Sequence, residues 1–270
     1  MRPDLPKRLF GGAVVALIAA VEIGFGGWVL AGVLPFLLYG LAHEWTRLTQ
    51  SAPSWRDDVL VAAAPVLVVV LFALASSFDG WRGDGLLPGL IVLLVVMALS
   101  VALLGYRGLR QRMSCICGGI YLGLPFLSLL WLRDDQRGLE IVVWLVVVII
   151  VTDSCAYFVG SSVGGPKLAP KISPGKTWSG LVGGLVSAMA VGTIACNLIG
   201  FTWYSAALLA GVLALIAQGG DLFESWLKRR AGVKDSGRII PGHGGLLDRL
   251  DGYMLALPAL ALVLVTKGVA

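Results

Sequence analysis

Charged residues are scarce in this sequence. Only 14% of its 270 residues are Asp, Glu, Lys or Arg, whereas 57% are hydrophobic. Soluble domains carry roughly 25% charged residues, so the composition excludes a protein whose main solvent is water. Several apolar runs reach the ~20 residues with which a helix crosses a bilayer core. The sequence therefore predicts an all-α, polytopic integral membrane protein.

Cysteine and histidine are also few, which leaves little material for a soft-metal site. Each of the four cysteines lies in an apolar stretch, and Cys115 and Cys117 have no second pair at zinc spacing. Free cysteine behaves as a small hydrophobic residue, which favours packing roles for all four. His43 and the nearby Trp45 are predicted to lie at the lipid–water interface, where tryptophan commonly anchors a span.

Basic residues outnumber acidic residues by 21 to 16, and the pI is about 9.2. Nucleic acid is one class of partner for such a charge. The basic residues, however, lie in short loops between apolar spans, which is the distribution that the positive-inside rule describes. We therefore expect membrane lipid around this protein and no nucleic acid bound to it.

Nine membrane-spanning helices are predicted, at about residues 10–22, 26–41, 59–78, 86–104, 115–132, 139–160, 179–199, 203–223 and 251–267. Of the 21 Lys and Arg residues, 17 fall on one side of the membrane, in the N-terminus and in loops 42–58, 105–112, 161–178 and 224–250. The other side holds the remaining 4. This asymmetry predicts that the N-terminus and the basic loops face the cytoplasm from the inner membrane.

The sequence shows no internal repeat, linker or second domain. We expect one transmembrane domain over residues 1–270, with N-terminal spans at about 10–132 and a catalytic half at about 139–267. The first apolar run follows a basic N-terminus, so a signal peptide is the alternative to a retained span. No clear cleavage site follows this run. That favours a retained helical hairpin, broken at the glycines of residues 24–27.

The longest polar run covers Ser225–Asp251 and reads SWLKRRAGVKDSGRIIPGHGGLLDRLD. Its basic residues can face phosphate oxygens, and they are Lys228, Arg229, Arg230, Lys234, Arg238 and Arg249. Its carboxylates can hold a hard cation such as Mg²⁺, and they are Asp235, Asp248 and Asp251. Its glycines can leave backbone N–H groups open to an oxyanion, and they include Gly242, Gly244 and Gly245. The combination predicts a site for metal and phosphate.

A polar stripe precedes this run at the end of the eighth predicted span. On a helix, Asp221, Ser225 and Lys228 are spaced i, i+4, i+7 and lie along one face, with Glu224 beside them. The alternative is a helix end that merely solvates its charges at the membrane edge. Asp221 follows the apolar run AALLAGVLALIAQGG, and an acid within the membrane is costly unless it is used. We therefore expect these side chains to serve the site.

Three carboxylates are predicted to share one Mg²⁺ site. Asp248 and Asp251 are spaced i, i+3 at the start of the last span, and Asp221 would complete the group. Asp153, in IIVTDSCAYFVG, is a further acid inside a predicted span and is by default a functional candidate. We expect Asp153 and Glu224 to contact the metal ligands and orient them, without binding the metal themselves. The alternative for Asp153 is a structural pair with a neighbouring Lys or Arg.

A second polar cluster, KLAPKISPGKTW, lies in the predicted loop 161–178. Its candidates for substrate binding are Lys167, Lys171, Ser173, Lys176 and Thr177. The alternative is an ordinary cytosolic loop that obeys the positive-inside rule. SPGKT matches part of a P-loop, but the full G-x-x-x-x-G-K-[ST] pattern and its preceding strand are absent. A Walker A nucleotide site is therefore not predicted.

The pattern SWLKR, four residues, KDSG, two residues and IPGHGGLLDRLD resembles the signature of phosphatidate cytidylyltransferases, also called CDP-diacylglycerol synthases. The segments GGDLFES, TDSCAYFVG and KLAPKISPGKTW are also similar to that family, so the resemblance covers about residues 115–257. Ser179 departs from it, because many members carry an acidic or amide residue there. Across the remainder of the chain only the hydropathy agrees.

This resemblance implies that CTP and phosphatidate react to CDP-diacylglycerol and pyrophosphate, with Mg²⁺ and a monovalent cation such as K⁺. It also implies a homodimer in the membrane. Asp221 and Asp248 match the family's metal-binding acids, and Ser225 and Lys228 match positions that contact phosphate, as Gly244 and Gly245 are also expected to do. The catalytic candidates are Lys228, Arg229, Lys234, Asp235, His243 and Arg249, with His243 as a general base or a donor to phosphate.

The residues and the implied reaction agree. The phosphate of phosphatidate is already an oxyanion, so its attack on the α-phosphorus of CTP needs little base catalysis. What the reaction needs is positive charge that holds two anions together and stabilises the leaving pyrophosphate. A site rich in Lys, Arg and Asp with one histidine suits that need.

Two other classes of membrane protein share some of these sequence features. A cation-coupled transporter would also have intramembrane acids and broken helices, but its polar residues would gather at the midplane of two paired halves. Here they gather in two loops on one side. CDP-alcohol phosphotransferases share the lipid and nucleotide chemistry, but their D-G-x-x-A-R pattern does not occur in this sequence.

Overall fold

The computed structural model describes residues 27–75, 86–103, 108–237, 239 and 244–267. The predicted span 10–22, the glycine break at its end, Arg238, Gly242 and His243 lie outside the described residues. The chain divides into two compact units. Unit 1 is Met1–Asp135 with Arg230–Leu250, and unit 2 is Gln136–Arg229 with Asp251–Ala270. The expectation of a single transmembrane domain stays a prediction.

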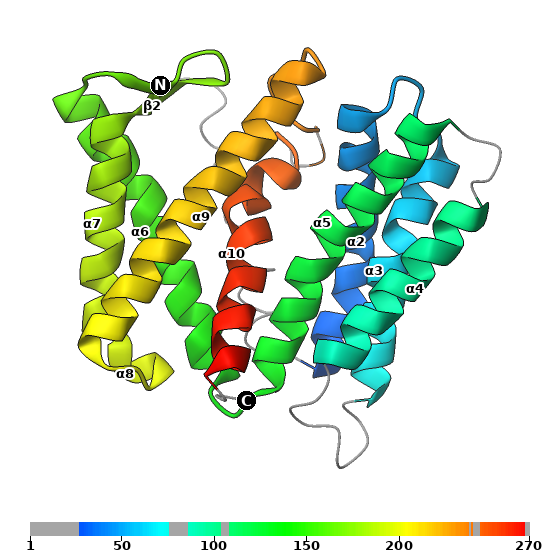
Figure 1. Ribbon diagram of the computed structural model, residues 1–270, viewed down its shortest axis with the longest axis horizontal. Helices are drawn as coiled ribbons and strands as arrows, with labels where there is room; N and C mark the ends of the chain where they lie inside the picture. Colours follow the sequence, from blue (N-terminus) through cyan, green and yellow to red (C-terminus); the bar gives the residue numbers. More distant parts are fainter. Residues whose placement is uncertain (1–26, 76–85, 104–107, 238, 240–243, 268–270) are drawn as a thin grey trace. The chain divides into compact units, whose positions relative to one another are not determined.

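Packed helices make up the first part of unit 1 (Figure 1): α2 Gly27–Thr49, α3 Trp55–Ala75, α4 Leu86–Leu103 and α5 Leu109–Asp134. A cluster of buried apolar side chains from α3, α4 and α5 fixes their packing, and it consists of Ala64, Val68, Leu93, Met97 and Leu127. Trp45 of α2 is buried, and its indole N–H donates to the carbonyl of Ser114 at 2.9 Å. The prediction of an interfacial anchor at Trp45 was therefore wrong.

The predicted loop 42–58 is mostly helical. α2 continues to Thr49 and α3 begins at Trp55, so only residues 50–54 connect them. The Asp57 carboxylate accepts hydrogen bonds from the backbone N–H and the hydroxyl of Ser54, at 2.8 and 2.6 Å. This satisfies donors that a helix start leaves unpaired. His43 lies 2.7 Å from Asp58, so polar side chains of the two helices pair with each other.

Unit 2 consists of α6 Gly138–Val163, a β-hairpin, α7 Trp178–Ile194, the short α8 Cys196–Ile199, α9 Trp203–Arg230 and most of α10 Leu247–Thr266. The hairpin pairs β1 Lys167–Ala169 with β2 Ser173–Thr177 in antiparallel orientation. It occupies the segment that was predicted as a loop. The all-α prediction therefore holds for the described residues except for this one hairpin.

α6 and α7 run side by side (Figure 1) because α7 presents small residues to α6. Gly180, Gly184, Ala188 and Gly192 recur every fourth residue on α7, and all are buried. A Cβ added to Gly184 would lie 2.7 Å from the carbonyl oxygen of Thr152. Helices in membranes commonly associate through such small residues, since these let the backbones approach closely.

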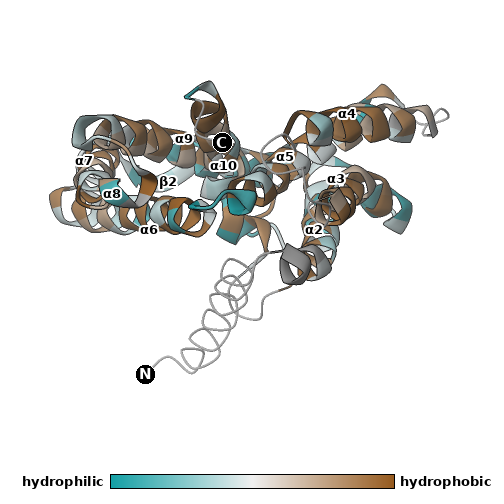
Figure 2. Ribbon diagram, turned by 90° about the horizontal axis from the view of Figure 1, so that it is seen from below, coloured by the Kyte–Doolittle hydropathy of each residue, from teal (hydrophilic) through white to brown (hydrophobic). Residues whose placement is uncertain are grey.

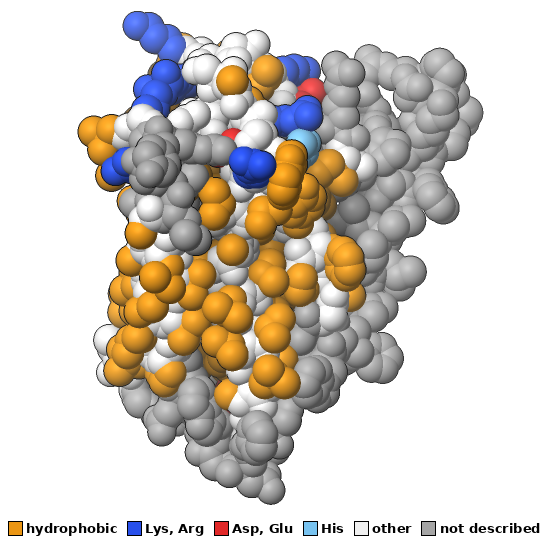
Figure 3. All heavy atoms as spheres, turned by 90° about the vertical axis from the view of Figure 1, so that its right-hand side faces the viewer, with side chains coloured by type: hydrophobic (Ala, Val, Ile, Leu, Met, Phe, Trp, Pro, Cys, Tyr) orange, Lys and Arg blue, Asp and Glu red, His pale blue; other side chains and the backbone are white. Residues whose placement is uncertain are grey.

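The described helices are those of an integral membrane protein. Five of them are long and apolar enough to cross a membrane, namely α3, α5, α6, α9 and α10, while α4 and α7 contain shorter apolar segments. Hydrophobic residues extend along most of the helices (Figure 2). On the face in Figure 3, hydrophobic side chains cover the described helices, and Lys and Arg gather toward one end. The described residues thus support the membrane class but not the count of nine spans.

Candidate active site

The predicted polar stripe on α9 forms, and its members pair within the helix. The hydroxyl of Ser225 donates to Asp221 at 3.3 Å, as the i, i+4 spacing predicted. The ammonium of Lys228 instead lies 3.1 Å from the carboxylate of Glu224. Glu224 is fully buried and Lys228 is 9% exposed. A buried charge needs a partner, so the Glu224–Lys228 pair explains how both charges are kept inside unit 2.

The hairpin and α9 meet at Lys176. Its ammonium lies 2.7 Å from the carboxylate of Asp221 and donates to the side-chain oxygen of Gln218 at 2.9 Å. About two turns beyond Asp221 along α9, Arg229 donates to the carbonyl of Ile172 in the hairpin at 3.1 Å. The cluster KLAPKISPGKTW and the polar face of α9 are therefore joined within unit 2.

Gln218 extends this network to α6. Its amide nitrogen donates to Asp153 at 2.9 Å while its oxygen accepts from Lys176. The side chain is 5% exposed. Sequence reasoning missed Gln218, although a lone amide at the end of the apolar run AALLAGVLALIAQGG was a usable signal. Gln218 thus links Asp153 to Lys176. The supporting role of Asp153 in a metal site stays a prediction.

α10 contributes Asp251 to the same unit. A Cβ at Gly220 would overlap the carbonyl oxygen of Asp251, so glycine allows the backbones of α9 and α10 to touch there. This contact places Asp251 beside the polar face of α9. Its carboxylate accepts the N–H of Gly252 at 2.7 Å and interacts electrostatically with Asp221, Asp153 and Lys228.

Asp248 lies in the first turn of α10, within unit 1, and one of its carboxylate oxygens already accepts from three donors. These are the backbone N–H of Ser236 at 2.9 Å, the hydroxyl of Ser236 at 3.1 Å and the N–H of Gly245 at 2.9 Å. The predicted use of the Gly245 N–H for a bound oxyanion was therefore wrong, because Asp248 takes that donor. Gly244 has a φ of +84°, which suits glycine and lets the chain turn into α10.

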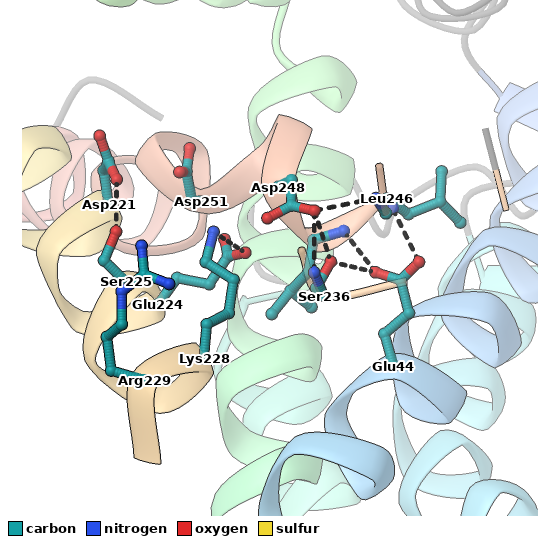
Figure 4. Close-up of polar contacts among 12 residues, drawn as sticks. Glu44, Asp221, Glu224, Ser225, Lys228, Arg229, Ser236, Leu246, Asp248 and Asp251 are labelled. Atoms are coloured by element: carbon teal, nitrogen blue, oxygen red, sulfur yellow. Dashed lines mark hydrogen bonds and ion pairs between the residues drawn. The ribbon is translucent and has the colours of Figure 1, made fainter. Parts of the chain in front are cut away.

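Glu44 on α2 is the second residue that sequence reasoning missed. It was placed in a loop, but its carboxylate is buried in unit 1 and binds the start of α10 (Figure 4). An acid in the otherwise apolar and aromatic segment LLYGLAHEW was the available signal. The fold, and not the local pattern, makes this residue informative.

The other predicted residues lie at the surface or serve the hairpin. Exposed side chains are those of Lys167, Lys171, Arg229, Lys234, Asp235 and Arg249, and Ser173 is half-buried. Thr177 is buried, and its hydroxyl accepts the N–H of Gly180 at 3.1 Å as the N-terminal cap of α7. Ser179 donates to the carbonyl of Gly164. Substrate contacts by Ser173 and Thr177 stay predictions.

The donor set of unit 2 suits a hard cation together with phosphate. Within the described residues, no group of three or more His, Cys, Asp or Glu side chains is arranged to hold a metal ion. Mg²⁺ does not require such a group, because it keeps several waters and usually takes one or two carboxylates plus substrate phosphates. Asp221 and Asp251 fit that requirement, and Lys176 and Lys228 supply positive charge beside them.

The chain belongs to the cytidylyltransferase family, whose profile matches residues 6–266. It is 37% identical to a phosphatidate cytidylyltransferase of Brucella suis biovar 1 (strain 1330) over 243 residues, which are 87% of this chain and 85% of that protein. It is 33% identical to a phosphatidate cytidylyltransferase of Bacillus subtilis (strain 168), over 97% and 98% of the two chains. The family predicted from the motif at Ser225–Asp251 is thereby confirmed.

Proposed function

We propose that this protein is a phosphatidate cytidylyltransferase, which converts CTP and phosphatidate into CDP-diacylglycerol and pyrophosphate for phospholipid synthesis. Its family and the activity for which its relatives are named support this function. The structural observation that carries it is the meeting of Lys176 and Asp221 in unit 2. This contact joins the KLAPKISPGKTW hairpin to the GGDLFES segment of α9, and both segments are similar to these enzymes.

In the proposed reaction, a phosphate oxygen of phosphatidate forms a bond to the α-phosphorus of CTP. The bond from that phosphorus to the β-phosphate oxygen breaks, and pyrophosphate leaves with its electrons. Lys228 and Lys176 neutralise charge that builds up on the transferring phosphates. In a site of low dielectric, this electrostatic stabilisation of the transition state is much stronger than in water. The acyl chains stay in the bilayer, beside the apolar helices.

From the resemblance and the helical spacing, we propose that Asp221, Asp248 and Asp251 are the Mg²⁺ ligands. When bound, Mg²⁺ would offset the charge on the pyrophosphate oxygens. Asp221 would exchange its contact with the Lys176 ammonium for the metal, which leaves Lys176 to bind phosphate. Gln218 hydrogen-bonds to both Asp153 and Lys176 and so holds these two side chains in place. The resemblance adds K⁺ as a second cation and a homodimer as the working form.

We also propose nine spans, with the N-terminus and the basic segments in the cytoplasm. The positive-inside rule supports this orientation, because 17 of the 21 Lys and Arg residues fall on one side. Both substrates would then meet where CTP is available.

The test uses the purified full chain in detergent micelles with phosphatidate, Mg²⁺ and CTP labelled at the α-phosphate. We expect label in CDP-diacylglycerol and one pyrophosphate released per lipid formed. A matched reaction with diacylglycerol in place of phosphatidate should give no product, since the attacking phosphate is absent. Phosphatidate-independent release of pyrophosphate, or label in no lipid, would refute the function.

A further inference from the structure

Glu44 is a buried acid that no step above uses. It lies on α2 and is 1% exposed. One carboxylate oxygen accepts the N–H of Leu246 at 2.9 Å, and the other accepts the N–H of Leu247 at 2.8 Å. The second oxygen also accepts the hydroxyl of Ser236 at 2.8 Å. A buried carboxylate is very costly unless it is hydrogen-bonded in this way.

The position of Glu44 is the one at which a bound anion would be expected. The first N–H groups of a helix have no partner within the helix, and the helix dipole makes that end positive. Helix starts therefore commonly bind phosphates. At α10 the Glu44 carboxylate takes this place, so the N–H groups of Leu246 and Leu247 serve the protein and not a substrate phosphate.

Ser236 connects Glu44 to Asp248. Its hydroxyl lies 2.8 Å from Glu44 and 3.1 Å from Asp248, and its backbone N–H donates to Asp248 at 2.9 Å. Ser236 belongs to the KDSG run and Asp248 to the start of α10. All of these contacts are within unit 1. Figure 4 shows Glu44 and Asp248 converging on Ser236.

Two glycines confirm that the chain is built around the Glu44 carboxylate. A Cβ added to Gly237 or to Gly245 would overlap its oxygens. Gly245 also donates its N–H to Asp248. The backbone at Gly237 and at Gly245 thus lies against one carboxylate, and a side chain larger than hydrogen at either position would displace it.

We propose that Glu44 is a positioning residue that acts through Asp248. By fixing Ser236 and the start of α10, it sets the place and orientation of the Asp248 carboxylate. Glu44 itself touches no substrate. This inference rests on the metal role that the proposed function gives to Asp248.

The test measures metal binding directly, apart from turnover. Mn²⁺ replaces Mg²⁺ at carboxylate sites, so its binding to the purified full chain is titrated by EPR. Glu44→Gln places an amide NH₂ against backbone donors. It should weaken Mn²⁺ binding about 10- to 100-fold, the loss typical when a residue that hydrogen-bonds to a metal ligand is replaced. It should raise the Mg²⁺ concentration needed for half-maximal activity by a similar factor. Ser236→Ala, which removes only the bridging hydroxyl, should act in the same direction.

Asp58→Asn is the matched control. Asp58 is another buried acid of unit 1 and bonds to α2 through Thr46 and His43. Its loss should lower the thermal midpoint without a change in Mn²⁺ affinity. Asp248→Asn should weaken Mn²⁺ binding, and adding Glu44→Gln to it should weaken binding no further if the two act as one unit.

Each outcome decides a different question. Weak binding in Asp248→Asn with unchanged binding in both Glu44→Gln and Ser236→Ala would overturn the positioning role alone. Unchanged binding in Asp248→Asn would overturn the metal role of Asp248 and the positioning proposal with it. If Glu44→Gln does not insert, Ser236→Ala decides, since it leaves the carboxylate and its two backbone donors in place.

Discussion

At the scale of the residue, the lysines of the two basic segments fall into two groups. Lys176 and Lys228 lie within reach of carboxylates in unit 2, whereas Lys171 and Lys234 are exposed. Burying two charges usually costs as much as their attraction returns. A membrane protein that keeps such pairs generally uses them. We therefore propose that Lys176 and Lys228, which lie beside carboxylates, bind phosphate and that Lys171 and Lys234 only orient the chain in the membrane.

The Glu224–Lys228 pair allows a sharp test of Lys228. Lys228→Gln should lower kcat and kcat/KM together by about 100-fold, the loss typical of a donor to transition-state charge. It should also destabilise the fold, because Glu224 loses its charge partner. Adding Glu224→Gln should restore the thermal midpoint but not kcat. Full kinetics with CTP varied measure both effects.

Arg230→Gln controls for generic positive charge at the membrane surface, and it should change kcat little. Recovery of kcat in the double Lys228→Gln, Glu224→Gln variant would mean that Lys228 only neutralises Glu224. Equal, small losses in the Lys228 and Arg230 variants would equally remove Lys228 from the chemistry.

The carboxylates make a second residue-level prediction. Asp221→Asn should lower kcat by at least about 10- to 100-fold, because replacing even a residue that only contacts a metal ligand costs that much. The variant should still insert into the membrane and purify. Asp251→Asn should do the same if it shares the cation. The measurement is turnover at saturating Mg²⁺. The control is Glu140→Gln, which replaces an exposed acid at the start of α6. Near-normal turnover in Asp221→Asn would exclude Asp221 as a metal ligand.

At the scale of the element, the small-residue face of α7 holds unit 2 together. Gly184→Leu should lower the thermal midpoint in detergent, because the Thr152 carbonyl lies where the new side chain begins. Overpacking of this kind typically costs about 1–3 kcal/mol. Ala190→Leu on the exposed face of the same helix is the control. Equal midpoints for the two variants would show that the close contact of α6 and α7 contributes little.

Elements were predictable from the sequence where the bilayer dictates them. The apolar runs at 59–78, 86–104 and 139–160 correspond to α3, α4 and α6, because a helix is the way to satisfy backbone groups in lipid. Their ends were not predictable in the same way. α2 continues into a polar segment because Trp45 and Glu44 are buried by tertiary contacts. The sequence of β2, SPGKT, has turn residues, so only its pairing with β1 makes it a strand.

The candidate site was predictable in its residue types but not in its pairings. Asp221 and Ser225 follow helical spacing and were found from it. The partners of Lys176 come from segments more than 40 residues away along the chain, and no local pattern indicates them. Glu44 and Gln218 were missed because their partners are distant along the chain, so the importance of each residue follows only from the groups that pack against it.

At the scale of the whole molecule, the remaining question is which side of the membrane carries the site. The charge asymmetry predicts that the hairpin and the segment after α9 face the cytoplasm, and that the link between α5 and α6 faces the other side. Lys171 and Lys234 are exposed in the first two segments, and Gln136 is exposed in the link. These three positions therefore report on both faces of the membrane.

Single cysteines at these positions test the orientation, in a background without the four native cysteines that still forms CDP-diacylglycerol. Lys171→Cys and Lys234→Cys should react with an impermeant maleimide in inside-out vesicles and not in intact cells. Gln136→Cys should show the opposite pattern, which controls for sealed membranes. Labelling of Lys171→Cys from outside intact cells would overturn the topology. It would also leave the site without access to cytoplasmic CTP, so the orientation and the activity of the same variants must agree.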